Sequence, residues 1–490
     1  MELNVLTVTL LCFIVLIYFI WIRGRPRNLP PGPINPLAVL RFQKNVYIVA
    51  SRFAKKYGAV YSMRGFGRSL FVMFNSIETI KEATLDKADS FSDRTASAVF
   101  DFIYEGSNGS LVFGHGKNWK EMRKFGANAL RNFGVGKRSV ANKINEETTF
   151  LVAAIEETNG KRFNPALAVN NAVSNIICNI SFGERYDYDN VKFQRLLSTL
   201  RSSAGAITVT SLLHSIPRVF LRMILCVPPF SGKIREFVVL KSYISDMIRE
   251  HQSTMDPNDV RDIIDMYLLE CEKQEGLGKS ETHLGGPWSF IMDLFAAGSD
   301  TTTTSLLWAL AIFCHYPEVQ EKIYQELLDV VGIDRLPIYE ERSQLPYTEA
   351  VILEVQRFRP VVPLVAHLCS RDAKIGGYFI PKGSKVVLNI WASGHDSTKW
   401  ENPDDFNPER FLSPDGKTVV NRESHIPFGI GRRVCLGETL AKTEIFLFLT
   451  GLVQRFRFRV PDGDPLPSLD GNHGVLLSIR PYEICAEMRA

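Results

Sequence analysis

The sequence lacks most of the short motifs by which proteins bind zinc, nucleotides or nucleic acids. Its eight cysteines lie far apart, with no CxxC pair and no cysteine–histidine cluster at zinc spacing, which argues against a disulfide framework and a structural zinc site. No glycine-rich dinucleotide fingerprint is present, so the chain has no convincing nicotinamide or flavin site of its own. A formal net charge of +4 over 490 residues, without a basic run that carries interleaved aromatics, argues against nucleic-acid binding.

Internal repeats and low-complexity segments are also absent, and only one linker-like stretch is found. It reads LPPGP over residues 29–33 and is too rich in proline for a helix or a central strand. The hydrophobic fraction of 45% and the charged fraction of 22% exclude a disordered or fibrous chain and allow a large core. One large domain after this linker is therefore the simplest organisation, although the chain is longer than most single cores allow.

Residues 5–22 form an almost unbroken apolar run, VLTVTLLCFIVLIYFIWI, close to the roughly 20 residues that cross a bilayer as a helix. A cleaved signal peptide is the alternative, but no basic segment precedes the run and no small-residue cleavage site is present. Arg23, Arg25 and Arg27 follow the run, which predicts that the body lies on the cytoplasmic side. The predicted organisation is a membrane anchor over residues 1–22, a basic and proline-rich linker over 23–37 and one large domain over 38–490.

Most of the remaining chain has helical periodicity, and strand patterns are shorter and fewer. The sequence therefore predicts a mainly α fold with a minor β-sheet region, preceded by the single transmembrane helix. The predicted strands are Val60–Arg64, Ser69–Phe74 and Lys385–Ile390, and the predicted helices are Ala141–Thr158, Val238–His251, Pro287–His315, Pro317–Val331, Tyr347–Arg357 and Leu436–Phe456.

One cysteine has surroundings unlike those of the others. Cys435 lies in PFGIGRRVCLGE, between Gly429, Gly431 and Gly437 and directly before a long apolar helix. Glycines allow positive φ angles and a close approach of the backbone to a flat ligand, and the N–H groups at a helix start favour an anion. Helix N–H groups and neighbouring arginines also lower the pKa of a cysteine, so a thiolate suits this position. An ordinary buried cysteine in a glycine-containing turn is the alternative.

A polar stretch, FAAGSDTTTTS, interrupts the apolar helix predicted over residues 287–315. Glycine and consecutive threonines are poor helix formers, and threonine hydroxyls can bond back to the carbonyl four residues earlier. Ala297 and Thr301 share a helix face, Gly298 removes bulk beside them and Asp300 adds a carboxylate. These features indicate a functional segment, and a buried helix that tolerates polar residues is the alternative.

Two further pairs of side chains lie at helical spacing. Glu354 and Arg357 are three residues apart, which alone is a common surface pair. Trp119 and Arg123 are four apart, so that an indole N–H and a guanidinium point the same way and suit a carboxylate. A surface arginine packed on tryptophan is an equally good interpretation of the second pair.

The cysteine loop carries a specific resemblance. The pattern Phe428-x-x-Gly431-x-Arg433-x-Cys435-x-Gly437 resembles, position for position, the haem-binding signature of the cytochrome P-450 superfamily. This resemblance implies the cytochrome P-450 fold, haem b as the cofactor and Cys435 as the thiolate ligand of its iron. It also implies that Phe428 packs beside the sulfur and that Arg433 pairs with a haem propionate.

Other segments resemble further elements of the same family. The polar helix is similar to its oxygen-binding helix, which implies the alcohol and acid roles for Thr301 and Asp300 and makes Ala297 a cofactor contact. Glu354-x-x-Arg357 and the segment PERF, which contains Arg410, resemble two family elements with a structural role. The propionate contacts that the microsomal branch of the family implies are Arg94, Trp119, Arg123 and His367.

The implied reaction inserts one atom of O2 into an apolar small molecule, such as a xenobiotic, a fatty acid or a steroid-like compound. Because the chain has no dinucleotide fingerprint, the electrons are expected from NADPH through a membrane-bound flavoprotein reductase, with cytochrome b5 as a further candidate donor. The microsomal branch implies the endoplasmic reticulum membrane, with the catalytic domain facing the cytosol. The candidate docking surface for an acidic reductase is a basic face of Lys120, Lys124, Arg131 and Arg432, with solvated surface charge as the alternative.

Two other functions remain open from the sequence. A haem-thiolate isomerase or peroxide-using enzyme shares the cysteine loop, although Thr301 and Asp300 argue against it, and a haem-binding sensor or carrier needs no turnover. The segments expected to line the substrate pocket are apolar and do not define the substrate; they are Ala96–Phe113, Phe290–Thr301, Val361–His367 and Asn472–Leu477.

Overall fold

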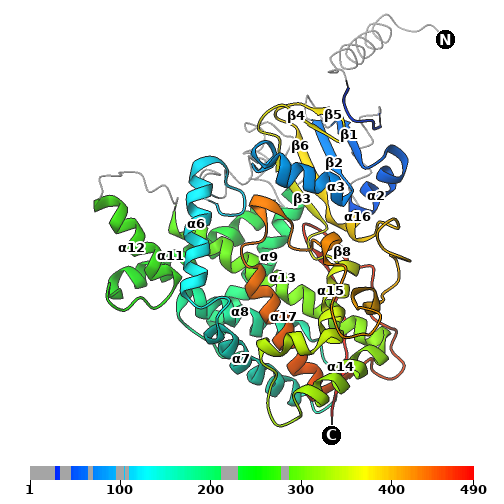
Figure 1. The fold of residues 1–490 in the computed structure, drawn as a ribbon. Helices are drawn as coiled ribbons and strands as arrows, with labels where there is room; N and C mark the ends of the chain where they lie inside the picture. Colours follow the sequence, from blue (N-terminus) through cyan, green and yellow to red (C-terminus); the bar gives the residue numbers. More distant parts are fainter. Residues whose placement is uncertain are drawn as a thin grey trace, which may run out of the picture.

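The computed structural model describes residues 28–33, 46–64, 70–94, 104, 110–210, 230–276 and 286–489. Helices dominate these residues, which confirms a mainly α fold with a minor β-sheet region. Figure 1 shows strands β1 to β6 gathered at one end of the molecule beside α2 and α3, while the long helices form most of the rest. The α-helices are α2 (Val46–Tyr57), α3 (Ile77–Lys81), α4 (Ala88–Phe91), α6 (Gly116–Asn132), α7 (Arg138–Glu156), α8 (Ala166–Phe182), α9 (Val191–Thr210), α11 (Phe230–Thr254), α12 (Ile263–Gly276), α13 (Pro287–His315), α14 (Pro317–Val330), α15 (Pro346–Phe358), α16 (Ile390–Gly394) and α17 (Glu438–Arg455).

The main sheet has four strands in the order β1-β2-β6-β3. Strands β1 and β2 pair antiparallel, β2 and β6 pair parallel, and β6 and β3 pair antiparallel. Their apolar side chains form a small core of their own with α3, while a much larger core joins the long helices. The strands are β1 (Val60–Arg64), β2 (Leu70–Phe74), β3 (Leu364–Leu368), β4 (Ala373–Ile375), β5 (Tyr378–Ile380), β6 (Lys385–Asn389), β7 (Phe456–Arg459), β8 (Asn472–His473), β9 (Leu477–Ser478) and β10 (Cys485–Met488).

Short helical turns connect these elements and bring the cysteine loop toward the sheet end of the molecule. The π-helical turn η2 (Glu82–Asp86) contacts the 3-10 turn η8 (Gly431–Arg433) of the cysteine loop. The remaining 3-10 turns are η5 (Tyr339–Gln344), η6 (Pro408–Phe411) and η7 (Arg422–Ser424).

Helix α13 runs through the middle of the molecule, as Figure 1 shows. Gly286 precedes it, Pro287 occupies its first turn and Pro317 stands two residues after its last residue, His315; the observed bounds equal the predicted ones. It packs against α8, α17 and α11, and most of its side chains from Ser289 to Cys314 are buried. The helix thus forms the centre of the larger core and carries the polar stretch inside it.

The other predicted elements exist as well, and all except β1 have shifted ends. Strand β1 has the predicted bounds, whereas the helix predicted over Val238–His251 is longer, because α11 already begins at Phe230. Two prolines at 228 and 229 precede it in the sequence, and proline is well tolerated at a helix start. The prediction counted only the apolar residues from Val238 onward and left out Phe230, Ile234 and Phe237, which continue the same helical spacing toward the N-terminus.

Part of the predicted linker is bonded to the body. The carbonyls of Pro30 and Pro31 accept hydrogen bonds from the Ser62 hydroxyl (2.8 Å) and backbone N–H (2.7 Å). A Cβ at Gly32 would lie 1.7 Å from the Ser62 carbonyl oxygen, so only glycine permits this approach. Among the described residues no helix is long and apolar enough to cross a membrane. The predicted transmembrane helix over residues 5–22 lies outside the described residues.

Candidate functional site

The cysteine loop has the backbone that its glycines predicted, with one difference. Gly429 and Gly431 have positive φ angles of 73° and 81°, and a Cβ at Gly431 would lie 2.3 Å from the Thr84 carbonyl oxygen of η2. Gly437 has a φ of −90° and is the N-cap of α17, so it is not a left-handed position. The Cys435 N–H donates to the Phe428 carbonyl (2.9 Å), which closes the loop in front of the helix.

The side chain of Cys435 is exposed, unlike those of Cys178, Cys314, Cys369 and Cys485, which are buried. Burial of its surroundings raises the pKa of the thiol, and this effect outweighs the Gly437 backbone N–H and the charge of Arg123, which lower it. The sequence-based expectation of a lowered pKa is therefore wrong for the protein alone. A metal ion deprotonates a coordinating thiol outright, so ligation does not require an acidic thiol beforehand.

Three arginines from distant parts of the chain gather beside this loop. The Arg433 Nε donates to the Ser92 carbonyl (2.7 Å), and Arg123 donates to the Val434 carbonyl (2.5 Å). Arg94 donates to the Ala366 carbonyl, and its buried Nε has no hydrogen-bond partner. Burial and mutual repulsion lower the pKa of Arg94 to about 10 and that of Arg433 to about 8.

These three guanidinium groups fit the carboxylates of a haem. They bond backbone carbonyls, and among the described residues no carboxylate forms an ion pair with any of them. Buried charges normally have a partner of opposite sign, so a cluster of like charges indicates an anion that the protein chain itself does not supply. The two propionates of a haem meet that requirement. They would also give the orphaned Nε of Arg94 an acceptor.

Trp119 and His367 lie among these arginines. The Arg433 guanidinium stacks on the Trp119 ring at 3.4 Å from its centroid, and the Trp119 indole N–H donates to the Leu111 carbonyl (3.2 Å). The Nδ1 of His367 is 2.6 Å from the Phe91 carbonyl oxygen, and burial, with the charges of Arg94 and Arg433, holds its pKa well below the ordinary value. The structure thus brings together all the residues that the sequence assigned to propionate binding.

The polar stretch of α13 has an open face. Ala297 is exposed and Thr301 is partly exposed, although the residues that follow on the same helix are buried. The Thr301 hydroxyl donates to the Ala297 carbonyl (2.7 Å), as the sequence predicted for a threonine four residues later. A Cβ at Gly298 would lie 2.5 Å from the Cδ1 of Ile177, so the glycine serves the packing of α13 on α8. Burial raises the pKa of Asp300 to about 6, against an opposing effect of Arg201.

The charged residues of the ExxR and PERF segments interlock as expected. Arg357 donates from Nε and Nη2 to the two carboxylate oxygens of Glu354 at 2.6 and 2.8 Å, and Arg410 donates to the same carboxylate at 3.1 Å. Glu354 and Arg357 are buried, so this pair is part of the core rather than a surface pair. Arg357 also donates to the carbonyls of Gly394 and Pro403, which fixes the chain downstream.

Sequence reasoning missed a buried carboxyl group that binds the segment before α6. Asp293 of α13 accepts hydrogen bonds from the Tyr104 hydroxyl (2.7 Å), the Ser110 hydroxyl (2.7 Å) and the Val112 N–H (3.1 Å). Its only signal in the sequence is one acidic residue in the apolar run FIMDLF. The partners lie 181 to 189 residues away, so no local pattern could have named them.

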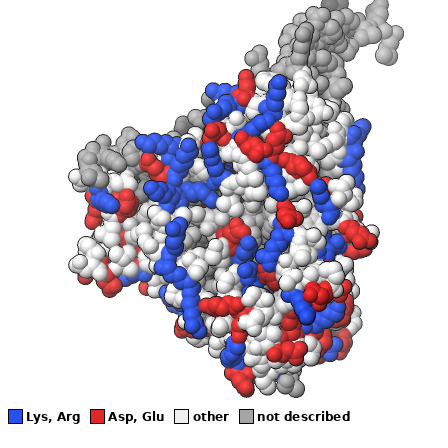
Figure 2. All heavy atoms as spheres, in the orientation of Figure 1, with Lys and Arg blue, Asp and Glu red and all other residues white. Residues whose placement is uncertain are grey.

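The basic face expected on the cysteine side is present on α6. Lys120, Lys124 and Arg131 are exposed along this helix, and Figure 2 shows lysine and arginine side chains on the side of the molecule where α6 lies. Arg432 is exposed as well, but it pairs with Asp89, so its charge is partly neutralised. Helix α6 therefore carries most of the uncompensated charge of this face.

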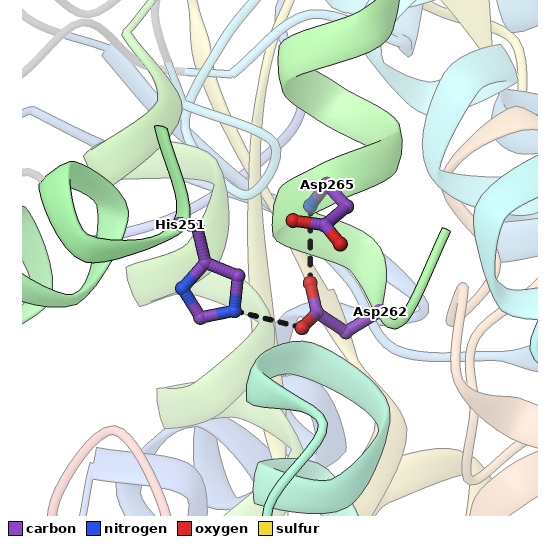
Figure 3. A group of neighbouring side chains, drawn as sticks. All are labelled: His251, Asp262 and Asp265. Atoms are coloured by element: carbon purple, nitrogen blue, oxygen red, sulfur yellow. Dashed lines mark hydrogen bonds and ion pairs between the residues drawn. The ribbon is translucent and has the colours of Figure 1, made fainter. Parts of the chain in front are cut away.

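A second group of titratable side chains lies between the end of α11 and the start of α12 (Figure 3). The Nε2 of His251 is 2.8 Å from a carboxylate oxygen of Asp262, and its Nδ1 is 2.8 Å from the Met247 carbonyl. Asp262 also accepts the Asp265 N–H (3.0 Å), and Arg261 binds both oxygens of Asp265 at 2.7 and 2.8 Å. These charges already balance one another, so the group is a helix–helix junction rather than a cation site.

The comparisons with known proteins agree with this geometry. A family model described as Cytochrome P-450 matches residues 26–486. The chain is 36% identical to Cytochrome P-450 2U1 of Mus musculus, over 98% of this chain and 95% of that protein. It is 38% identical to Cytochrome P-450 2J2 of Homo sapiens (95% and 92% covered) and 39% identical to Cytochrome P-450 2J5 of Mus musculus (99% and 96% covered). The loop around an exposed cysteine, the arginine cluster and the open helix face are thus found in a chain that belongs to the cytochrome P-450 family, whose members carry haem on a cysteine thiolate.

Proposed function

We propose that this chain is a haem-thiolate monooxygenase in which Cys435 is the axial ligand of the iron. The single observation that carries the proposal is the exposed Cys435 just before α17, beside three arginines that have no carboxylate partner among the described residues. When haem is bound, its iron activates molecular oxygen so that one atom enters an apolar substrate. All remaining functions belong to side chains of this protein.

The residues around the loop hold and orient the cofactor. Arg94, Arg123 and Arg433 donate to the propionates, and His367 and Trp119 complete this polar end. Phe428 packs beside the sulfur and limits access of water to it. Ala297 is the small, exposed residue of α13 that lets a flat ring approach the helix.

Thr301 and Asp300 would supply protons for the oxygen chemistry that a bound haem carries out. Since the Thr301 hydroxyl already donates to the Ala297 carbonyl, its oxygen remains available to accept a hydrogen bond from a water molecule and so to order that water. Asp300, with a pKa raised to about 6 by burial, can exchange a proton close to neutral pH. This pair favours oxygen activation over the isomerase or peroxide-using alternatives.

The substrate is an apolar small molecule, and the electrons come from NADPH through a flavoprotein reductase, with cytochrome b5 as a further donor. The basic face of α6 supports a partner of acidic surface charge. The domain over residues 38–490 is held at the endoplasmic reticulum membrane by an anchor over residues 1–22, with the linker over 23–37 between them. The arginines that follow the apolar run support a cytosolic orientation.

A reduced carbon monoxide difference spectrum tests the ligand, and reconstitution tests the reaction. We expect purified protein to give the thiolate-type spectrum, and Cys435→Ala to lose it, with Cys369→Ala as a control because that cysteine is buried elsewhere. Substrate-dependent NADPH consumption with added reductase distinguishes a monooxygenase from a peroxide-using enzyme or a sensor. A thiolate-type spectrum that survives in Cys435→Ala would refute the assignment.

A further inference from the structure

Helix α17 carries a buried acid that no cation neutralises. The side chain of Glu444 is 1% exposed, and its Oε2 accepts a hydrogen bond from the Thr302 hydroxyl of α13 at 3.0 Å. Its Oε1 is buried without a hydrogen-bond partner, and no ion pair to Glu444 occurs within the described part of the chain. Another buried acid, Glu147 of α7, contrasts with it, because Arg185, Asn175 and Tyr188 all bind that carboxylate.

A carboxyl group in such a place is stable only as the protonated, uncharged acid. Removal of an ionised carboxyl group from water costs several kcal/mol, and one hydroxyl donor does not offset this cost. Burial raises the pKa of Glu444 to about 8, and the Thr302 hydrogen bond opposes this shift only in part. Glu444 is therefore a neutral carboxylic acid at the pH of the cytosol, and it binds Thr302 as an uncharged group.

The two helices that this hydrogen bond joins carry the two halves of the proposed site. Helix α17 begins three residues after Cys435, and Glu444 lies about 9 Å further along it at 1.5 Å per residue. Thr302 directly follows Thr301 on α13. Apolar contacts between helices tolerate small sliding movements, whereas a buried polar pair defines a single register.

We propose that Glu444 is a positioning residue that, as an uncharged acid, fixes the register of α17 on α13 through Thr302 and thereby sets the spacing between Cys435 and Thr301. This inference rests on the proposed function. The spacing between Cys435 and Thr301 matters because a bound haem would be served by both residues. Glu444 touches neither the sulfur nor the reacting atoms. Its effect reaches the site through the position of the two helices alone.

Infrared spectroscopy of the holoprotein tests the charge of Glu444. At neutral pH or slightly below, the wild-type minus Glu444→Gln difference spectrum should contain the carbonyl-stretch band of a protonated carboxylic acid, which ionised carboxylates lack. Glutamine preserves the acceptor oxygen and the volume, so this variant should retain wild-type stability. A difference spectrum without the acid band would overturn the proposal, because Glu444 would then be ionised.

The reduced carbon monoxide complex tests the positioning without any substrate. The stretching frequency of bound carbon monoxide depends on the polar groups that face it, so it reports the place of α13 relative to the haem. We expect Glu444→Gln to retain the wild-type frequency, whereas Glu444→Met and Thr302→Val each shift it in the same direction. The double variant should shift it no further than the larger single effect, because both substitutions remove one shared interaction.

Thr450→Val is the matched control, because Thr450 is equally buried on α17 but its hydroxyl bonds only to carbonyls of the same helix. This control should leave the frequency unchanged. If Glu444→Met keeps the wild-type carbon monoxide frequency and the wild-type protein shows the thiolate-type spectrum, the positioning role is refuted but the proposed function is not. Absence of the thiolate-type spectrum from the wild-type protein would instead refute the proposed function.

Discussion

The Asp293 cluster, which consists of Asp293, Tyr104, Ser110 and the Val112 N–H, should be a sensitive point of the fold. Asp293→Ala leaves three donors without an acceptor, and an unsatisfied buried donor costs about 1–3 kcal/mol, so we expect a loss of roughly 3 kcal/mol or more. Asp293→Asn can keep its carbonyl oxygen toward Ser110 and the Val112 N–H, but it then presents an amide N–H to the Tyr104 hydroxyl, which must change from donor to acceptor. Its loss should be about 1–3 kcal/mol.

The cluster also connects to the proposed cofactor site. The neighbouring Leu111 carbonyl accepts the Trp119 indole N–H, and Trp119 stacks under Arg433. A loosened segment before α6 should therefore weaken haem retention as well as lower the free energy of unfolding. Both effects should be larger in Asp293→Ala than in Asp293→Asn.

Urea unfolding of the holoprotein, with haem content measured after purification, checks this prediction. Tyr104→Phe is a milder comparison, because it removes a single hydroxyl donor and leaves the carboxyl group two other partners. If Asp293→Asn were as stable as the wild-type protein, the cost of burying the carboxyl group would equal the benefit of its hydrogen bonds, and the reasoning would be wrong.

Three further predictions follow from side chains described above. Thr301→Ala should keep haem content and substrate binding but release more hydrogen peroxide and form less product per NADPH, because proton delivery is impaired; an unchanged ratio would make Thr301 a helix residue only. Burial opposes the charge of His251, but Asp262 raises its pKa above the ordinary 6.5, so the stabilisation that His251→Gln removes should be largest below about pH 6.5 and decline as the pH rises through the folded-state pKa in urea unfolding. Gly298→Ala should lower the free energy of unfolding by about 1–3 kcal/mol through a clash with Ile177, less the roughly 1 kcal/mol that alanine gains over glycine in a helix. Ile177→Ala should remove this clash, so Gly298→Ala should cost less in that variant than in the wild-type protein. An equal cost of Gly298→Ala in both would contradict the packing argument.

Local pattern predicted the elements well where one signal dominates. The bounds of α13 and β1 were both predicted, and prolines stand at the start of α13 and two residues after its end. The start of α11 was placed too late, because the prediction began at Val238 and left out the apolar residues before it, Phe230, Ile234 and Phe237.

The candidate site was predicted through resemblance rather than through local chemistry. Arg94, Arg123 and Arg433 are separated by up to 339 residues, so only the family pattern could group them before the fold was known. Local chemistry alone gave the wrong sign for Cys435, since helix N–H groups and arginines do lower its pKa but burial has the larger effect. Asp293 and Glu444 escaped prediction because a single acid in an apolar helix does not indicate its partner on another element.

The arginine cluster has a consequence for the protein before it receives its cofactor. Three cations that repel one another at close range oppose the closing of the chain around them, and because they are buried, dissolved salt screens them only weakly. Cofactor uptake and the final closing of the segments around Ser92 and Val434 should then occur as one event. Replacement of Arg94 by a neutral side chain should stabilise the haem-free chain and at the same time weaken its hold on haem. A substitution that raises the stability of the haem-free chain but lowers its affinity for haem identifies a residue that serves function rather than folding.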